Sequence, residues 1–232
     1  MKKLLIILAA MLAVASCKKD DTLIYGSFET GTFHEGRFYS DRGVVFNIRE
    51  NVSSRDIADI RRAFIYCDIY TSEDNGKSYD IRLRDFTEMY ITDPVMASSL
   101  SPDRVAEEDP ATLSVCWLTG NYINFQMQFV TVSDSKAEHR FSIIVDDAPH
   151  GGDSLLVKIE HFADGEYIGA QGFPEEDYAY GNRYLSLPLG DLVDDEVTSI
   201  PFQVSLYTNN KTDDGLVTPE KSLSSYTGTL KR

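Results

Sequence analysis

Four histidines and a few acidic pairs are the side chains in this sequence that could support acid–base or metal chemistry. The histidines are His34, His139, His150 and His161, and none belongs to a His-Glu-x-x-His or another closely spaced ligand pair. No Gly-x-Ser-x-Gly sequence offers a serine nucleophile. His139 and His161 fall at the ends of two predicted strands, where hydrogen-bonded structural roles are favoured. We therefore predict no catalytic residue and no enzymatic activity.

Neighbouring carboxylates raise two further hypotheses. Glu175-Glu176 or Asp194-Asp195 could serve a glycosidase, but that mechanism needs two carboxyl groups about 5 to 9.5 Å apart in a cleft. Asp146-Asp147 with Asp153, or the acids of 191–196, could supply oxygens to calcium, but neither set has EF-hand spacing. Solvated loop charge is favoured for all of them. We predict no metal and no cofactor, and an envelope glycan hydrolase is the least favoured function.

The segment 162–183 combines four glycines with aromatic side chains and predicts a long loop. Loops of this length in compact domains are usually functional or disordered. Exposed rings could contact a glycan or a protein partner, or the same rings could cap the end of a core. Both interpretations stay open. The candidate recognition residues are Tyr167, Phe173, Tyr178 and Tyr180.

The N-terminus is typical of a secretory signal. Lys2 and Lys3 precede an apolar run over 4–14, which is too short to cross a bilayer as a helix and is followed by small residues. The sequence 14–17, Val-Ala-Ser-Cys, resembles the lipobox of bacterial lipoproteins. We predict a signal peptide over 1–16, which is cleaved before Cys17, and attachment of lipid, including palmitate, to that cysteine. Acyl chains hold a protein on a membrane without a spanning helix.

The residues that follow Cys17 predict a location. Lys19, Asp20 and Asp21 resemble the surface-export signal of Bacteroidota lipoproteins, although a plain polar tether over 17–27 is the alternative. We therefore predict an outer-membrane, lipid-anchored protein exposed at the cell surface, or otherwise on the periplasmic face. Thr22 and Ser154 are each the middle residue of a short Asp-Ser/Thr-aliphatic pattern, in 21–23 and 153–155, and are candidate O-glycosylation sites.

The charge of the chain limits its partners. Cleavage before Cys17 removes two of the 22 lysines and arginines and none of the 37 acidic residues, which leaves a net charge of −17. Nucleic-acid binding depends on Lys and Arg, so we predict no nucleic-acid partner, although Arg61, Arg62, Arg82 and Arg84 could form a local basic patch. Anionic lipid should repel a body this acidic, so the membrane is a partner only through the anchor.

The candidate residues must be positioned by strands, because short β-rich runs separated by turn residues dominate the chain. Hydrophobic residues are 42% of the sequence, enough for a packed core. Residues 28–96 predict a small OB-like barrel with one short helix over 55–62, which Ser53 or Ser54 could cap. Residues 97–111 are rich in serine, proline and acids and predict a linker. Cys67 and Cys116 fall in different predicted domains, which favours two small buried thiols over a disulfide.

The second half, 112–232, predicts a β-sandwich. Ile123, Phe125, Met127 and Phe129 alternate with polar residues, which indicates a strand with one buried face. Further strands are predicted over 139–145, 155–161, 184–187, 200–207 and 224–230. At least seven strands without a long helical period are typical of a sandwich. The predicted fold class is therefore all-β, a small OB-like barrel followed by a β-sandwich.

Four ordered motifs then resemble the NigD-like family of Bacteroidota lipoproteins. They are Tyr79–Phe86, Trp117–Phe125, His139–Val145 and Val157–His161. The resemblance implies an N-terminal OB-like domain and a C-terminal β-sandwich. It implies little about activity and brings no catalytic residues, although a bacteriocin-associated immunity or accessory role is supposed for the family.

Together these observations predict a non-enzymatic binding or accessory lipoprotein of the cell envelope, with an envelope protein or a glycan as its partner. The alternatives are a bacteriocin-associated immunity or accessory factor and, as the least favoured, an envelope glycan hydrolase. Gene neighbourhood would discriminate among these classes.

Overall fold

The computed structural model of the chain describes residues 23–70, 76–147, 154–174, 178–194 and 196–231. The predicted signal peptide, Cys17, the Lys19-Asp20-Asp21 run and Thr22 lie outside these residues. Within the described ranges, no helix combines the length and the apolarity needed to cross a membrane.

The fold is all-β, as predicted, and the chain divides into two compact units. Unit 1 runs to Asp59 and includes Phe64–Thr87; unit 2 contains Ile60–Ala63 and everything from Glu88 onward. The division therefore falls before the predicted linker over 97–111. Those residues belong to unit 2.

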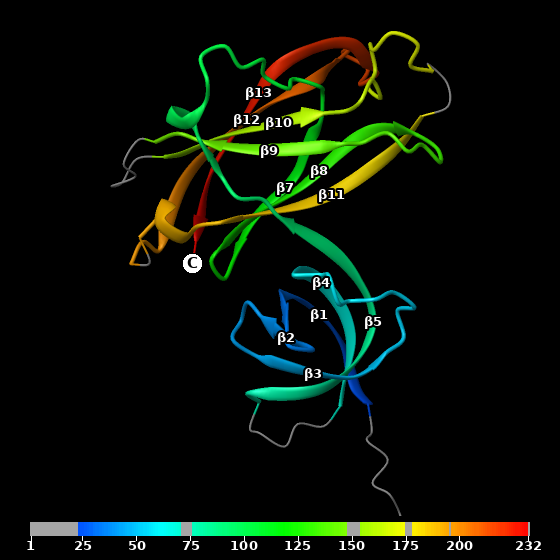
Figure 1. Cartoon of the computed structure of the whole chain (residues 1–232), viewed down its shortest axis with the longest axis vertical. Coiled ribbons are helices and arrows are strands. Elements are labelled where there is room, and N and C mark those ends of the chain that lie inside the picture. Colours follow the sequence, from blue (N-terminus) through cyan, green and yellow to red (C-terminus); the bar gives the residue numbers. More distant parts are fainter. Residues whose placement is uncertain (1–22, 71–75, 148–153, 175–177, 195, 232) are drawn as a thin grey trace, which may run out of the picture. The chain divides into compact units, whose positions relative to one another are not determined.

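Unit 1 is a five-stranded barrel built around alternating apolar residues (Figure 1). Its strands are β1 (Leu23–His34), β2 (Arg37–Ser40), β3 (Val45–Asn51), β4 (Arg62–Tyr70) and β5 (Ser78–Ile91). They follow the order β3-β2-β1-β4-β5, and a parallel β3–β5 pair closes the ring. In the middle of β4, the buried Ile65 and Cys67 alternate with the exposed Phe64 and Tyr66. This period of two is typical of a strand with one buried face.

The predicted helix over 55–62 is wrong. Residues 52–61 form bends and turns, and β4 begins at Arg62. Ser54 has a φ of 58°, in the left-handed region that does not continue an α-helix. The Asn51 Oδ1 atom accepts hydrogen bonds from the backbone N–H and hydroxyl of Ser53. Short polar side chains thus satisfy the backbone locally, in competition with a helix.

Unit 2 is a two-layered sandwich, as predicted (Figure 1). The first sheet contains the end of β5, β11 (Tyr178–Pro188), β8 (Tyr122–Val132) and β7 (Thr112–Thr119), and Met89 of β5 pairs in parallel with Tyr184 of β11. The second sheet has the order β13-β12-β10-β9-β6. Its strands are β6 (Val95–Met96), β9 (Arg140–Val145), β10 (Leu155–Phe162), β12 (Ser199–Lys211) and β13 (Val217–Lys231). Two single-turn 3-10 helices, η1 (Ala97–Ser99) and η2 (Gly190–Leu192), lie in the connections.

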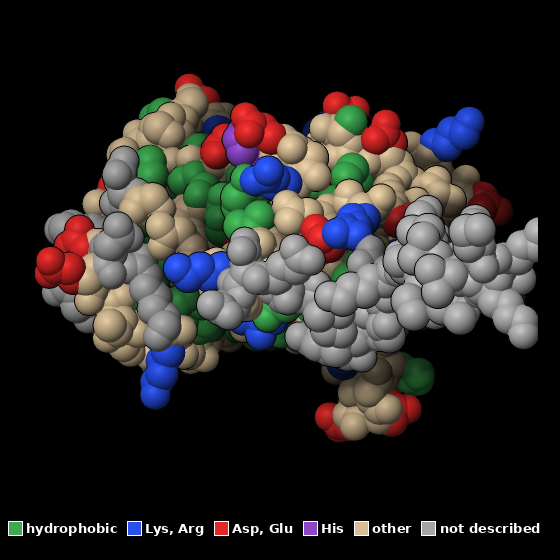
Figure 2. Space-filling model, turned by 90° about the horizontal axis from the view of Figure 1, so that it is seen from below, with side chains coloured by type: hydrophobic (Ala, Val, Ile, Leu, Met, Phe, Trp, Pro, Cys, Tyr) green, Lys and Arg blue, Asp and Glu red, His purple; other side chains and the backbone are tan. Residues whose placement is uncertain are grey.

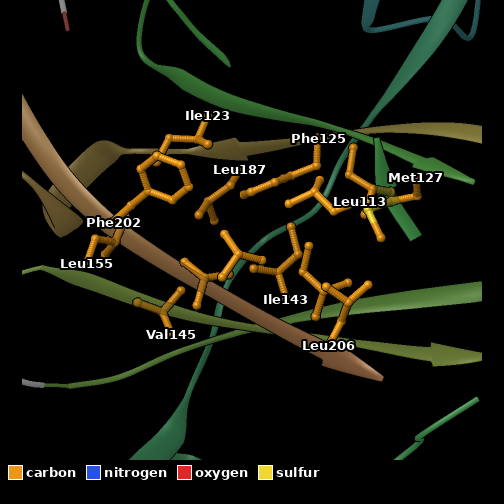
Figure 3. Packing of buried hydrophobic residues seen from close by; sticks show 14 of the residues in the cluster. Leu113, Ile123, Phe125, Met127, Ile143, Val145, Leu155, Leu187, Phe202 and Leu206 are labelled. Atoms are coloured by element: carbon orange, nitrogen blue, oxygen red, sulfur yellow. The ribbon is translucent and has the colours of Figure 1, made fainter. Parts of the chain in front are cut away.

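The core of unit 2 lies between its two sheets (Figure 3). Phe125 of β8 and Leu187 of β11 are fully buried on one side, and Val145 of β9 and Leu155 of β10 on the other. Phe202 of β12 lies among them in Figure 3. Each is one member of an alternating pattern, so one face of each strand packs inward. Burial of such side chains contributes about 1.5–3 kcal/mol each.

Residues 97–111 pack on unit 2 instead of linking two domains. The Asp109 backbone N–H donates to the His161 carbonyl, and the Asp109 carboxylate accepts from the Ala163 N–H. Arg104 forms an ion pair with the buried Glu160 of β10, and Ala111 is 4% exposed. The polar composition that suggested a linker therefore serves hydrogen bonds to the neighbouring strand.

Arg62 is the largest fully buried side chain and belongs to unit 2. Its Nε atom donates to Ser186 Oγ over 3.0 Å, and its Nη2 atom donates to Asn124 Oδ1 and Thr119 Oγ1, each over 3.2 Å. The guanidinium carbon lies 3.9 Å from the ring centroid of Tyr122, a cation–π distance. The planar donor array of arginine suits this mixture of oxygen acceptors and an aromatic face.

The basic patch suggested for unit 1 does not form as predicted, because Arg62 is buried in unit 2. Arg82 pairs with Glu50 and Arg84 pairs with Asp68. Acidic and basic side chains are also interspersed on the face drawn in Figure 2. The positive charge of these arginines is therefore offset locally.

Candidate functional site

The loop predicted over 162–183 is shorter in the structure, because β11 begins at Tyr178. Tyr178 and Tyr180 lie on this strand, opposite Val132 and Val130 of β8. Gly181 was one of the glycines that suggested a loop, yet it is a strand residue. A Cβ atom at this position would lie 2.5 Å from the Phe129 ring, so glycine permits close packing here.

Three of the four predicted recognition residues come together. The ring of Phe173 lies 6.3 Å from that of Tyr178, which in turn lies 5.6 Å from the ring of Tyr180 in an edge-on arrangement. Tyr180 is 51% exposed and Tyr178 is 36% exposed. Partial burial and the neighbouring Tyr178 hydroxyl raise the pKa of Tyr180, so it stays neutral at physiological pH. Tyr167 lies apart from this cluster, with Lys221 Nζ 5.8 Å from its ring centroid.

Phe173 and Tyr178 line a pocket of about 490 Å³, which we call the aromatic pocket. It lies between the segment 168–174, the start of β11 and the start of β13. Its lining residues are almost all apolar: Ile168, Gly169, Ala170, Phe173, Pro174, Tyr178, Val217 and Pro219. The hydroxyl of Tyr178 is the one polar side-chain group in this lining. Polar atoms nevertheless make up about half of the pocket surface, so the pocket offers hydrogen-bonding groups beside its apolar side chains.

Contacts with the sandwich fix one wall of the aromatic pocket. The Asn209 Nδ2 group donates to the carbonyls of Ile168 and Thr218, over 3.1 and 3.0 Å. Gly169 has a φ of 101°, and a Cβ atom there would lie 2.6 Å from the Pro219 carbonyl oxygen. The wall therefore depends on glycine at this position, both for its backbone angle and for close approach.

A second cavity, of about 530 Å³, lies on the outer face of the second sheet, and two carboxylates line it. Glu160 accepts hydrogen bonds from Arg104, Lys158 and the Glu107 N–H. Burial raises the pKa of Glu160, but these donors lower it by a larger amount. The pKa of Glu160 therefore lies below its ordinary value. An acid held ionised in this way is unsuited to donate a proton to a leaving group. Glu160 is therefore not suited to the general-acid role of a glycosidase.

His139 and His161, predicted to be structural, are both buried and lie together. His139 Nδ1 and His161 Nε2 are 3.1 Å apart, and His161 Nδ1 lies 3.1 Å from the Pro110 carbonyl oxygen. Their positions at strand ends were predicted, but the contact between the two rings was not. The signal that could have paired them is the antiparallel register of β9 and β10, which sets His161 opposite Phe141.

The remaining candidate residues lie in ordinary surroundings or outside the described ranges. Ser154 is exposed, and His150, Asp153 and Glu175-Glu176 are not described. Among the residues that are described, no group of three potential ligands could hold a metal ion. Cys67 and Cys116 are free thiols on β4 and β7, as predicted, and burial raises the pKa of each to about 12.

No family model and no curated protein matches the sequence. Solved structures do match the fold. One is a proposed lipoprotein from Bacteroides fragilis, at a TM-score of 0.61 and 14% identity, covering 89% of this chain and 98% of that one. Another is a NigD-like immunity protein from Bacteroides caccae, at a TM-score of 0.57 and 18% identity, covering 88% and 94%. This chain has the NigD-like fold.

The NigD-like resemblance predicted from the four motifs is thus confirmed for the fold. Three of the motifs supply adjacent strands of the sandwich: Trp117–Phe125 spans β7 and β8, and the other two lie on β9 and β10. A proposed toxin-related protein from Parabacteroides distasonis shares the fold as well, at a TM-score of 0.55 and 14% identity, with coverage of 88% and 92%. At these identities the solved structures show the fold alone. The activity has to be inferred from the residues of the site.

Proposed function

We propose that the protein is a lipid-anchored lipoprotein of the outer membrane, exposed at the cell surface, that acts as a non-enzymatic binding or accessory module. The anchor rests on the lipobox-like residues before Cys17, and the surface location on Lys19, Asp20 and Asp21. The fold shared with a proposed lipoprotein of Bacteroides fragilis supports the first part.

The observation that carries the binding role is the aromatic pocket. Its apolar lining, with Phe173 and Tyr178 side by side, suits insertion of an aliphatic or aromatic side chain from an envelope protein. Aromatic residues are enriched at the centres of protein interfaces. A glycan ring would stack on the exposed tyrosines, but Tyr178 carries the one polar side-chain group among the described lining residues. We therefore favour a protein partner over a glycan.

Replacing Phe173 by alanine should remove most of the specific binding. Loss of one buried aromatic anchor typically costs about 2 kcal/mol of binding free energy, or about 30-fold in affinity. We would cross-link intact cells, purify the protein and compare the recovered envelope proteins between wild type and variant by quantitative mass spectrometry. Phe28→Ala is the matched control, because Phe28 is 62% exposed but lies on the barrel.

Recovery of the same envelope proteins with Phe173→Ala as with wild type would contradict a role for the pocket. Binding on a glycan array that depends on Tyr178 and Tyr180, without any cross-linked protein, would instead assign the site to a glycan.

The surface location has its own test. Protease added to intact cells should degrade the wild-type protein, while replacement of Asp20 and Asp21 by alanine should protect it until the cells are lysed. A periplasmic marker protein reports cell integrity. If wild type is also protected in intact cells, the protein faces the periplasm and the export interpretation of these residues is wrong.

Fewer observations support an immunity role than support a binding role. One NigD-like neighbour is an immunity protein, but 18% identity conveys only the fold. No group of described residues favours a toxin as the partner over another envelope protein. The binding module is therefore the function that the site supports best.

A further inference from the structure

His139, His161 and Glu166 form a buried line of titratable groups at one end of the sandwich. His139 is 6% exposed and precedes β9, and His161 is 2% exposed and lies on β10. Glu166 belongs to the segment that follows β10. Its carboxylate accepts hydrogen bonds from Thr131, Ser135 and the Val132 N–H. Its Oε2 atom lies 3.6 Å from His139 Nε2, which is longer than a hydrogen bond.

The hydrogen bonds determine where the protons lie. The Pro110 carbonyl can only accept, so His161 Nδ1 carries a proton and donates it. If His161 is neutral, its Nε2 atom is an acceptor, and His139 Nδ1 must donate to it. A neutral His139 then has no proton on Nε2. That atom would turn a lone pair toward the Glu166 carboxylate.

His139 Nε2 is in fact left without a partner. Among the described residues, it is the only buried side-chain nitrogen or oxygen with no hydrogen bond. An orphaned buried polar atom is destabilising, because it gives up its hydrogen bonds to water without gaining others. A single proton on this atom removes the mismatch, because it turns two facing acceptors into a donor and an acceptor.

The charged groups around His139 act in both directions. Burial lowers its pKa, and Arg183 of β11, which donates to the His139 carbonyl, lowers it as well. Glu166 and Asp164, from the segment after β10, raise it. Glu138 and Arg140, its neighbours in the chain, pair with each other. The aromatic ring of Phe129 stacks on the imidazole at 4.3 Å and supplies no charge.

We propose that His139 Nε2 is a proton-binding site, and that Glu166 is the built-in counter-ion that closes on it when the surroundings become mildly acidic. One proton then connects Glu166, His139, His161 and Pro110 in a continuous chain of hydrogen bonds. Glu166 is the residue through which the segment after β10 would be drawn toward the sandwich. The inference does not depend on the proposed binding partner.

His161 is expected to remain neutral while His139 takes this first proton. It already donates to Pro110, it is more deeply buried, and a charged His139 disfavours a second charge 3.1 Å away. Burial, followed by the effect of His139, lowers the pKa of His161 to about 4. The two histidines should therefore titrate in a fixed order.

The test is an NMR titration of the histidine ring protons in the mature chain without lipid, from pH 8 to pH 4. His139 should titrate before His161. Glu166→Gln should move the His139 midpoint down by about one pH unit, because the amide can donate to the neutral Nε2 atom and removes the counter-charge. In wild type, backbone amides over 166–170 should gain about tenfold in exchange protection factor on protonation, and in Glu166→Gln they should not.

Glu138→Gln is the matched control. It removes a carboxylate next to His139 in the chain that pairs with Arg140, so the His139 midpoint should hardly move. Ser135→Ala is a second, milder variant, since it removes one hydrogen bond from Glu166 without touching His139. The proposal is overturned if His161 takes the first proton, or if Glu166→Gln leaves the His139 midpoint where it is in wild type.

Discussion

Replacing Arg62 by methionine should lower the free energy of unfolding of unit 2 by about 3 kcal/mol. The guanidinium supplies donors to the buried Ser186 and Asn124, where water cannot replace it, and to the half-buried Thr119. Methionine fills a similar volume, so the expected loss comes from unsatisfied acceptors and the lost contact with Tyr122. It also removes the cost of burying a cation, which keeps the expected loss moderate.

Trp117 makes the measurement specific. It is the only tryptophan, it lies on β7, and its ring is 6.3 Å from that of Tyr184. Urea unfolding followed by tryptophan fluorescence therefore reports on unit 2. Arg61→Met is the control: Arg61 is exposed, and its loss should change stability by less than about 0.5 kcal/mol. Equal stabilities for the two variants would mean that the Arg62 network contributes nothing.

Lowering the pH should destabilise unit 2 by about 2 kcal/mol between pH 7 and pH 5, and by about 3 kcal/mol at pH 4. The pKa of His161 falls from 6.5 in the unfolded chain to about 4 in the folded one. The unfolded chain therefore binds this proton more tightly. The stability that His161 contributes is complete above pH 6.5 and is lost as the pH falls toward 4.

Glu166 adds a second loss at lower pH. Burial raises its pKa, but hydrogen bonds from Ser135 and Thr131 outweigh burial and bring it down to about 2. Its contribution is complete above pH 4.5 and is lost as the pH falls toward 2. Urea unfolding monitored by Trp117 at each pH measures both effects. His161→Gln should reduce the dependence between pH 6.5 and 4, and the remainder should come from His139, whose pKa is also lowered by burial. A wild-type curve that is already flat in this window would contradict the burial of a neutral His161.

The alternating pattern in the sequence predicted most of the sandwich because these strands bury one face only. Ile123 and Phe125 are buried where a period of two requires it, and β8 (Tyr122–Val132) covers the whole predicted alternation from Ile123 to Phe129. Periodicity specifies which face is buried. It does not specify which strand lies beside which, and the pairing of β10 with β12 in parallel could not have been read from it.

The failed predictions share one physical cause, which is that local composition does not reveal tertiary partners. Gly181 suggested a turn, but its role is to admit the ring of Phe129. The acids of 97–111 suggested a linker, but Asp109 binds the backbone that follows β10. Arg62 suggested a surface charge because arginine is rarely buried. The acceptors of Arg62 belong to Thr119, Asn124 and Ser186, which are distant from it in the sequence.

Three of the four aromatic candidates, Phe173, Tyr178 and Tyr180, lie together in the structure, although the sequence predicted only that they belong to a possible recognition loop. The fourth, Tyr167, faces Lys221 of β13. The position of Glu166 beside His139 was missed because it depends on the distance between the two side chains. Residue types alone do not predict that distance.

The strand order of unit 2 also has a consequence for how the chain acquires its structure. Met89 pairs with Tyr184, and the second sheet is bordered by β13, which ends at Lys231. The second sheet of the sandwich is therefore complete only once β13 is available. The strands of the barrel are all present far earlier. Non-local pairing slows folding, so the barrel is expected to form first while the strands of unit 2 wait with unpaired edges. During that interval the unpaired strand edges are most exposed to pairing with another chain.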